Sequence, residues 1–279
     1  MAKILVTGAN GMLGQDLCPI LEDADFIDEI IETDHNSLDI TDELQVKNFI
    51  TKEKPDFIIH CAAYTNVDGA ETDTEIAENI NIKGTENIAK YSAKTGATLI
   101  FISTDYVFDG EKKEKYLPND KPNPINKYGQ TKFEAEKAIQ KICKKYYIVR
   151  TSWLYGHYGK NFVETMLKLA EENKEIKVVS DQIGSPTWTV PLSDGICSLI
   201  EENPEYGIYH ICGSGETSWY DFAKEIFKIS YINAKLSPCA SEEYKTAAKR
   251  PKYSVLESSI KCENWKKSLK SYLELRLDE

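Results

Sequence analysis

The sequence predicts an α/β fold in which a doubly wound parallel sheet is followed by a smaller C-terminal lobe. Through the first 150 residues, short apolar runs alternate with segments of helical periodicity, which is the pattern of parallel strands joined by helices. Beyond Arg150 this regular alternation ends, and the tryptophans are concentrated there. We therefore expect a first domain over residues 1–150, completed by segments within 160–212, and a lobe formed mainly by residues 151–279.

The first domain is expected to contain a series of strands, each of them a short apolar run. These strands should span Lys3–Thr7, Glu29–Thr33, Asp56–Cys61, Thr98–Ser103 and Tyr146–Arg150. The helices between them should span Met12–Leu21, Asp42–Lys52, Ile76–Ala93 and Asn126–Lys144. Thr41 precedes the second helix and suits its N-cap position, because a hydroxyl there can accept a hydrogen bond from a free backbone N–H group.

The C-terminal half shows weaker patterns, from which we expect further helices and two short strands. The helices should span Asn161–Glu171, Val190–Glu201 and Ser218–Ile229, and the strands Ile176–Val179 and Gly207–Ile211. No internal repeat or low-complexity linker separates the two halves of the sequence. The smaller lobe should therefore cover the carboxyl ends of the strands and share one continuous core with the first domain.

Composition and charge exclude several classes of protein. Hydrophobic residues make up 41% and charged residues 28% of the chain, as in ordinary globular proteins. The net charge of −11 repels phosphate backbones, so nucleic acid is not an expected partner. No apolar run reaches the length of a membrane-spanning helix, and the N-terminus does not resemble a secretory signal. The seven cysteines form no CxxC pair, which indicates reduced thiols in a cytoplasmic protein.

Three glycines in the segment TGANGMLG, Gly8, Gly11 and Gly14, follow the first expected strand and open the first expected helix. This context is typical of a Rossmann dinucleotide site, where the backbone must approach a pyrophosphate without Cβ atoms in the way. Asp34 ends the second strand about twenty residues later, where an acidic residue can bind the ribose hydroxyls. A carboxylate there would repel a 2′-phosphate, so we expect NADH, with NADPH possible. Alternatively, Asp34 only caps a turn.

Tyr128 and Lys132 lie four residues apart in YGQTK, so one face of the expected helix carries both. A tyrosine hydroxyl has an ordinary pKa near 10, and a nearby ammonium group together with an oxidised nicotinamide ring would lower it. Thr104, in ISTDYVF at the end of the fourth strand, can hydrogen-bond a substrate carbonyl while Tyr128 protonates it. Thr104 as a turn residue and Asp105 as a cap are the structural alternatives.

These motifs resemble those of the extended short-chain dehydrogenase/reductase superfamily and, within it, the dTDP-4-dehydrorhamnose reductase family. The resemblance covers almost the whole chain. It rests on TGANGMLG, the segment Asp39–Thr41, HCAAYTNVDGAE, ISTDYVFDG, YGQTK, RTSWLYG, DQIGSPT and KRP. It implies reduction of a 4-keto sugar nucleotide by a nicotinamide cofactor, with a homodimer as a possible assembly.

The resemblance also implies roles for individual residues. Cofactor contacts are implied for Gly8, Gly11, Met12, Leu13, Gly14, Asp34, Asp39, Ile40, Ala63, Tyr64 and Thr65. A catalytic triad is implied for Thr104, Tyr128 and Lys132, of which Tyr128 and Lys132 also contact the cofactor. Substrate contacts are implied for Thr104, Asp105, Trp153 and Arg250. Core packing for Trp153 and a plain surface charge for Arg250 remain open as alternatives.

Other interpretations of the same sequence also remain open. A nucleotide-sugar epimerase or dehydratase has the same scaffold, and the regulatory subunit of methionine adenosyltransferase resembles this family while acting as a binding partner. Some relatives hold magnesium through glutamates at a dimer interface, and Gln15 and Val190 occupy the matching positions here. We therefore expect no metal.

Overall fold

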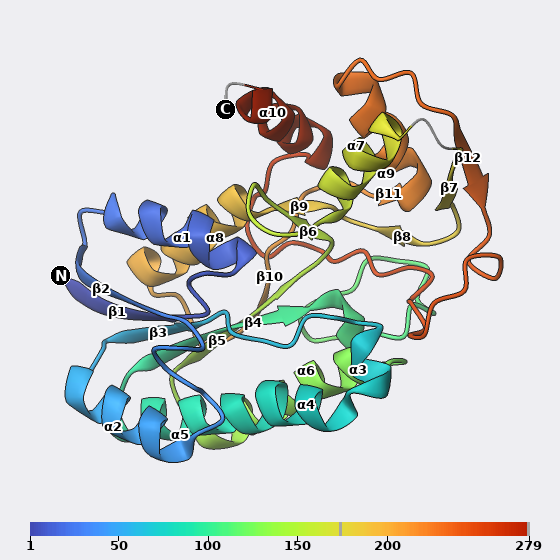
Figure 1. Cartoon of the computed structure of the whole chain (residues 1–279). Coiled ribbons are helices and arrows are strands. Elements are labelled where there is room, and N and C mark those ends of the chain that lie inside the picture. Colours follow the sequence, from blue (N-terminus) through green and yellow to red (C-terminus); the bar gives the residue numbers. More distant parts are fainter. Residues whose placement is uncertain (173–174, 278–279) are drawn as a thin grey trace.

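A six-stranded parallel sheet forms the centre of the computed structural model, which describes residues 1–172 and 175–277 (Figure 1). The strand order is β10-β5-β4-β3-β1-β2, and every neighbouring pair is parallel. The sheet consists of β1 (Ala2–Thr7), β2 (Ile27–Thr33), β3 (Phe57–His60), β4 (Thr98–Thr104), β5 (Tyr146–Thr151) and β10 (Gly207–His210). The strand order reverses between β1 and β3, and open parallel sheets bind their ligands at such a point.

Helices cover both faces of this sheet, as Figure 1 shows. On one face lie α1 (Met12–Glu22) and α8 (Thr189–Glu202), and on the other α2 (Glu43–Glu53), α5 (Thr85–Thr95) and α6 (Lys127–Ile142). Successive residues of a strand point to opposite faces, so Ile4 and Val6 pack in the first hydrophobic layer and Leu5 in the second. The predicted fold class is thus confirmed.

Two details of the helices differ from the sequence prediction. The N-cap of α2 is Asp42, whose carboxylate accepts hydrogen bonds from the N–H groups of Leu44 and Gln45. Thr41 was the wrong choice, because its hydroxyl donates to Asp39 instead. The helix expected at Ile76–Ala93 is also interrupted.

The interrupted helix is divided into α4 (Thr74–Glu78), a π-helical turn η1 (Asn79–Gly84) and α5, and a short helix α3 (Gly69–Thr72) precedes it. The wider turn directs Asn81 to the chain that follows β3 and to α6. Its side-chain amide exchanges hydrogen bonds with the backbone of Tyr64 and donates to the hydroxyl of Thr131. A period-based prediction cannot detect such a turn, because it changes the helical register by one residue.

The C-terminal lobe packs around its own apolar cluster, which includes Tyr155, Phe222 and Tyr272. Its helices are α7 (Phe162–Glu171), α9 (Trp219–Ile229) and α10 (Trp265–Leu277). Short strands pair as β6 (Leu154–Tyr155) with β9 (Thr187–Trp188), β7 (Ile176–Val179) with β12 (Leu236–Cys239), and β8 (Ile183–Gly184) with β11 (Thr217–Ser218). The sequence did not predict α10 or the two-residue strands, whereas α7, α9 and β7 lie where they were expected.

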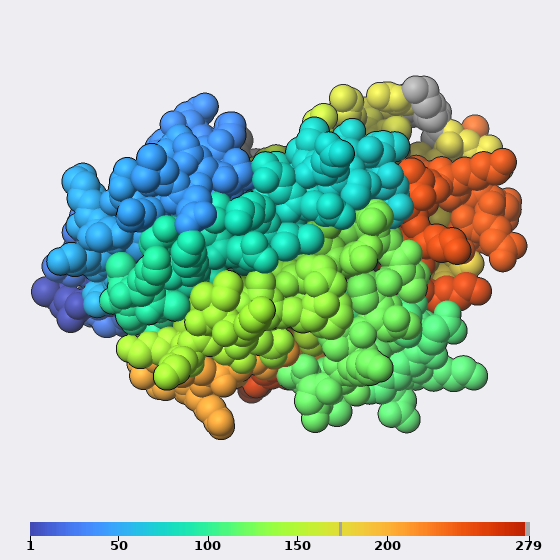
Figure 2. Space-filling model, turned by 90° about the horizontal axis from the view of Figure 1, so that it is seen from below, coloured from blue at the N-terminus to red at the C-terminus, as the bar shows by residue number. Residues whose placement is uncertain are grey.

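A C-terminal strap, residues 248–257, connects the lobe to the sheet domain. On the lobe side, Ile183 donates its N–H to Lys252 and accepts one from Ser254. On the sheet side, Tyr116 donates its N–H to Val255, and the side chain of Asn126 donates to the carbonyl of Lys249. In Figure 2 this orange-red segment lies against the cyan segment that carries α3 and α4.

Within the described ranges, 1–172 and 175–277, no helix is both long and apolar enough to cross a membrane.

Candidate active site

A cavity of about 1230 Å³ opens at the carboxyl ends of β1, β3, β4 and β5. This position agrees with the rule for ligands of open parallel sheets. Most of the predicted site residues line it: Gly8, Gly11, Met12, Leu13, Gly14, Asp34, Asp39, Ile40, Ala63, Thr65, Thr104, Asp105, Tyr128, Lys132 and Trp153. The cavity therefore brings the glycine turn and the expected catalytic residues to one place. Tyr64 and Arg250 are not among the residues that line it.

The glycine turn at the start of α1 forms a cradle that side chains would fill. Gly8 has a φ of +72°, and a Cβ atom there would lie 2.7 Å from the backbone nitrogen of Ala62. A Cβ atom on Gly14 would lie 2.4 Å from the carbonyl oxygen of Ala9. Gly11 is the N-cap of α1 and supplies no side-chain acceptor, so the N–H groups of the first turn are left for a ligand. These features fit the pyrophosphate of a dinucleotide.

Asp34 lies at the end of β2 and borders the cavity. Its Oδ1 accepts the N–H groups of Asn36 and Ser37, and its Oδ2 accepts the side-chain amide of Asn10 at 2.8 Å. Hydrogen bonds from Ser37, first of all its backbone N–H, lower the pKa of Asp34, so the group is an anion at neutral pH. Asp34 therefore caps a turn and also presents a negative charge to the cavity, which combines the two interpretations of the sequence.

The three expected catalytic side chains meet where β4 ends and α6 begins. Thr104 accepts a hydrogen bond from the N–H of Tyr106 and donates to Asp105 at 3.1 Å. The hydroxyl of Tyr128 interacts with that of Thr104. Lys132 follows one helical turn later and is buried, with its Nζ 4.0 Å from the ring centroid of Phe101.

Burial dominates the ionisation of this group. It raises the pKa of Tyr128, and the negative charge of Asp105 raises it further, while the contact with Thr104 opposes the shift. Burial also lowers the pKa of Lys132 to about 7, although the carboxylate of Glu136 acts in the opposite direction. The side chains of the protein thus do not produce the lower tyrosine pKa expected from the sequence, because desolvation and the charge of Asp105 outweigh the contact with Thr104.

A buried ion pair, which was not predicted from the sequence, supports the catalytic helix. Glu136 lies one turn beyond Lys132 on the same face of α6 and pairs with Arg150 on β5 at 2.6 Å, both side chains being 1% exposed. Ser103 on β4 donates to the same carboxylate at 2.6 Å. The pair therefore fixes α6 against the two strands at the edge of the cavity. The spacing of four residues after Lys132 was the available signal.

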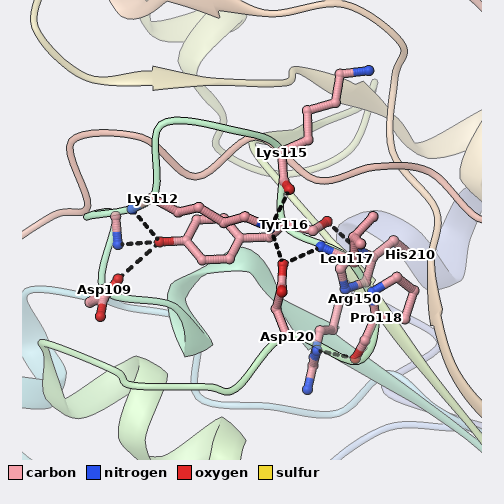
Figure 3. A network of polar contacts seen from close by, with 10 residues as sticks. Asp109, Lys112, Lys115, Tyr116, Leu117, Pro118, Asp120, Arg150 and His210 are labelled. Carbon is pink, nitrogen blue, oxygen red and sulfur yellow. Dashed lines mark hydrogen bonds and ion pairs between the residues drawn. The ribbon is translucent and has the colours of Figure 1, made fainter.

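Arg150 also holds the connection between the two catalytic segments, as Figure 3 shows. Its Nη1 donates to the carbonyl of Pro118 at 3.2 Å. Within this connection, Tyr116 donates to Asp109 at 2.9 Å, and Asp120 accepts from the backbone of Leu117 at 2.7 Å. The chain between Thr104 and Tyr128 is thus tied to itself and to β5, which fixes the position of both hydroxyls.

Trp153 borders the cavity in an uncommon conformation. Its φ is +47°, which is unfavourable for a bulky residue and occurs mainly where the surroundings enforce it. The indole stacks on Trp219 with 3.5 Å between ring centroids and 4° between the planes. Both indoles line the cavity, and Trp153 is partly buried against the core of the C-terminal lobe. Packing and ligand contact are therefore compatible here. Trp219 and Lys160 also line this cavity, and neither was predicted from the sequence.

Tyr64 and Arg250, which were predicted to contact ligands, form hydrogen bonds with other side chains of the protein. The hydroxyl of Tyr64 donates to Asp73 at 2.9 Å. The guanidinium of Arg250 forms two hydrogen bonds with Asp68, at 2.7 and 3.1 Å. Asp68 also accepts the N–H of Ala248, so this cluster fastens the strap to the segment after β3.

Among the residues that the structure describes, no group of three or more histidine, cysteine, aspartate or glutamate side chains could hold a metal ion. The absence of a metal remains a prediction of the sequence analysis. All seven cysteines are free thiols.

Comparison with known proteins yields a consistent set of relatives. The chain matches the family described as the RmlD substrate binding domain over residues 2–276. The spore coat polysaccharide biosynthesis protein SpsK of Bacillus subtilis is 41% identical over 99% of this chain and 98% of its own length. A structure described as a dTDP-4-dehydrorhamnose reductase of Clostridium acetobutylicum is 45% identical, with a TM-score of 0.95 and 99% of each chain covered. The dTDP-4-dehydrorhamnose reductase of Bacillus anthracis, in complex with NADP, is 42% identical, with a TM-score of 0.93 and coverage of 98% and 99%.

Proposed function

The chain belongs to the RmlD substrate-binding domain family, and we propose that it is the NAD(P)H-dependent reductase that converts dTDP-4-dehydro-β-L-rhamnose to dTDP-β-L-rhamnose. The resemblance inferred from the sequence is thereby confirmed. One observation carries the proposal: Thr104, Tyr128 and Lys132 border the same cavity as the glycine cradle. A hydride donor and a proton donor can thus reach one carbonyl group.

Different residues of the chain are proposed to bind the cofactor, donate the proton and orient the substrate. The reduced cofactor, when bound, supplies the hydride, and the N–H groups after Gly11 would hold its pyrophosphate. Tyr128 donates a proton to the carbonyl oxygen, and Thr104 orients that oxygen. Lys132, which is buried at the cavity, would hold the ribose of the cofactor. Ala63 and Thr65 border the cavity after β3 and belong to the proposed cofactor site.

The substrate is proposed to occupy the part of the cavity nearest the C-terminal lobe. Asp105 and Trp153 would contact the sugar, with Trp219 supporting the indole of Trp153. Lys160 lines the cavity and offers a charge for a diphosphate. Arg250 can bind the diphosphate only if its ion pair with Asp68 is broken. A homodimer and a cytoplasmic location belong to the same proposal, and light scattering tests the first of them.

The deciding experiment follows NAD(P)H oxidation with dTDP-4-dehydro-L-rhamnose and, beside it, with the UDP counterpart. One equivalent of cofactor consumed per sugar reduced identifies a reductase, because an epimerase or dehydratase returns the hydride and consumes none. Turnover with only the dTDP sugar supports the substrate proposed here. No turnover, together with a stable complex with a methionine adenosyltransferase, would instead indicate a regulatory subunit.

We predict that Asp34→Ala shifts cofactor preference toward NADPH. The carboxylate is an anion at the cavity edge, so its removal weakens support of the ribose hydroxyls and relieves repulsion of a 2′-phosphate. The measurement is the ratio of kcat/KM for NADH to kcat/KM for NADPH. An unchanged ratio would mean that Asp34 serves only the turn with Asn36 and Ser37.

For Trp153→Ala we expect a higher KM for the sugar nucleotide and an almost constant Kd for NADH. The indole borders the cavity, whereas its stacking partner Trp219 keeps the wall of the lobe in place. Thermal melting run beside the NADH titration separates this from a packing role. Loss of a core tryptophan typically costs about 3–5 kcal/mol, and a large drop in Tm with a matching loss of NADH binding would contradict substrate contact.

A further inference from the structure

Asp105 is a buried carboxyl group beside the catalytic hydroxyls. Its side chain is 2% exposed and lines the cavity. Within residues 1–172 and 175–277, no lysine, arginine or histidine forms an ion pair with it. A buried carboxylate without a countercharge is unfavourable, so its presence at this point calls for a chemical role.

Hydrogen bonds connect Asp105 to both sides of the active site. Its Oδ2 accepts the hydroxyl of Ser254, on the strap, at 2.5 Å. Its Oδ1 lies 3.1 Å from the hydroxyl of Thr104, which in turn interacts with the hydroxyl of Tyr128. Asp105 thus lies between the strap and the hydroxyl of Thr104, and the pKa of Tyr128 responds to both Asp105 and Thr104.

We propose that Asp105 is the proton reservoir that restores Tyr128 after each turnover, through the hydroxyl of Thr104. This inference rests on the proposed reductase function and adds to it the source of the second proton. It differs from a substrate contact by Asp105, because it requires the carboxyl group to gain and lose a proton in every cycle.

The proton transfers balance without any further reactant. Tyr128 gives its hydroxyl proton to the substrate oxygen and is left as a phenolate. The hydroxyl of Thr104 then donates its proton to the phenolate while its oxygen accepts the proton of Asp105, so that one O–H bond breaks for each one formed. Asp105 becomes a carboxylate, which Ser254 stabilises as a hydrogen-bond donor. Solvent in the cavity returns a proton to Asp105.

The pKa values of Asp105 and Tyr128 favour proton transfer from Asp105 to the phenolate of Tyr128. Burial raises the pKa of Asp105 to about 7, while hydrogen bonds from Ser254 and Thr104 oppose that rise. The pKa of Tyr128 is raised above its ordinary value, so a proton moves downhill from Asp105 to the phenolate. The other titratable groups whose pKa values respond to Asp105 are Tyr106, beside it in the chain, and Cys212, after β10.

The first test is the pH dependence of kcat at saturating substrate. The wild-type kcat should fall as the pH rises through the pKa of Asp105, because the ionised carboxyl has no proton to give. Asp105→Asn should lower kcat by at least about tenfold near pH 6 and remove this dependence. Ser254→Ala removes a hydrogen bond that holds the pKa of Asp105 down, so the fall should move to higher pH. Asp194→Asn is the control, because Asp194 lies on α8, outside the cavity lining, and should leave the profile unchanged.

A second test observes the proton directly in the free protein. The infrared difference between wild type and Asp105→Asn should contain the carbonyl band of a protonated carboxyl near pH 6, and that band should be lost near pH 8. The proposal is overturned if the band is absent, or if both Asp105→Asn and Ser254→Ala keep the wild-type pH profile. An unmoved profile would assign the ionisation to Lys132, whose pKa is also near 7. The infrared test needs no substrate, so a failure of the proposed function is recognised separately, by the lack of wild-type turnover.

Discussion

Replacing Tyr128 with phenylalanine should lower kcat by at least about a hundredfold, the lower end of the range for a general acid. The substitution removes only the hydroxyl group, which interacts with Thr104 at the cavity. The ring still packs edge-on against Tyr106, with 6.1 Å between centroids, so the fold and the glycine cradle should not change. The measurements are kcat from NAD(P)H oxidation and the Kd for NADH from fluorescence titration.

A matched control is Tyr91→Phe. Tyr91 is buried on α5, donates to Glu43, and lies outside the residues that line the cavity. It also loses a single hydrogen-bonded hydroxyl, yet kcat should remain close to the wild-type value. Near-normal turnover in Tyr128→Phe would show that another group donates the proton, whereas weak NADH binding would show damage beyond the hydroxyl.

The sequence predicted the parts of the site that depend on local spacing. The glycines lie within seven residues of one another, and Tyr128 and Lys132 are one helical turn apart, so each motif carries its own geometry. Asp105 and Ser254 are separated by 149 residues and meet only because the strap returns to the sheet domain. Sequence spacing therefore could not predict the contact between Asp105 and Ser254.

The same distinction holds for the fold. Each strand of the sheet that was expected within the first 150 residues is present, because buried parallel strands are continuous apolar runs. The short strands of the C-terminal lobe have two residues each in β6, β8, β9 and β11, which is too few to show a period. The π-helical turn η1 was missed because it retains helical composition while shifting the register.

The buried pair of Glu136 and Arg150 illustrates both effects. Helical spacing alone places Glu136 on the same face of α6 as Lys132. Its partner Arg150, however, is the polar residue that ends an apolar run, and nothing in the sequence connects it to Glu136. The contact determines how α6 lies on the sheet, and therefore where Tyr128 and Lys132 point. Its removal should thus affect the whole molecule and the active site.

Glu136→Gln should lower the free energy of unfolding by about 3–5 kcal/mol, because it leaves a buried guanidinium without its countercharge. Both side chains are 1% exposed, so water cannot compensate. The carbonyl of Pro118 and the ring of Phe108 remain as partners of Arg150, but neither is an anion. Urea denaturation followed by fluorescence and circular dichroism gives the free energy, provided that the two transitions coincide.

Two further variants identify the cause of this loss. Glu134→Gln changes a partly exposed residue of the same helix, which pairs with Lys137, and should alter stability by no more than about 0.5 kcal/mol. The double variant Glu136→Gln with Arg150→Met removes both charges and should recover most of the stability, since the destabilising term is the unpaired ion. If the double variant is less stable than Glu136→Gln alone, packing and the contact of Arg150 with Pro118 matter more than charge. If Glu136→Gln lowers the free energy of unfolding by less than about 1 kcal/mol, the carboxylate of Glu136 does not hold α6 in position.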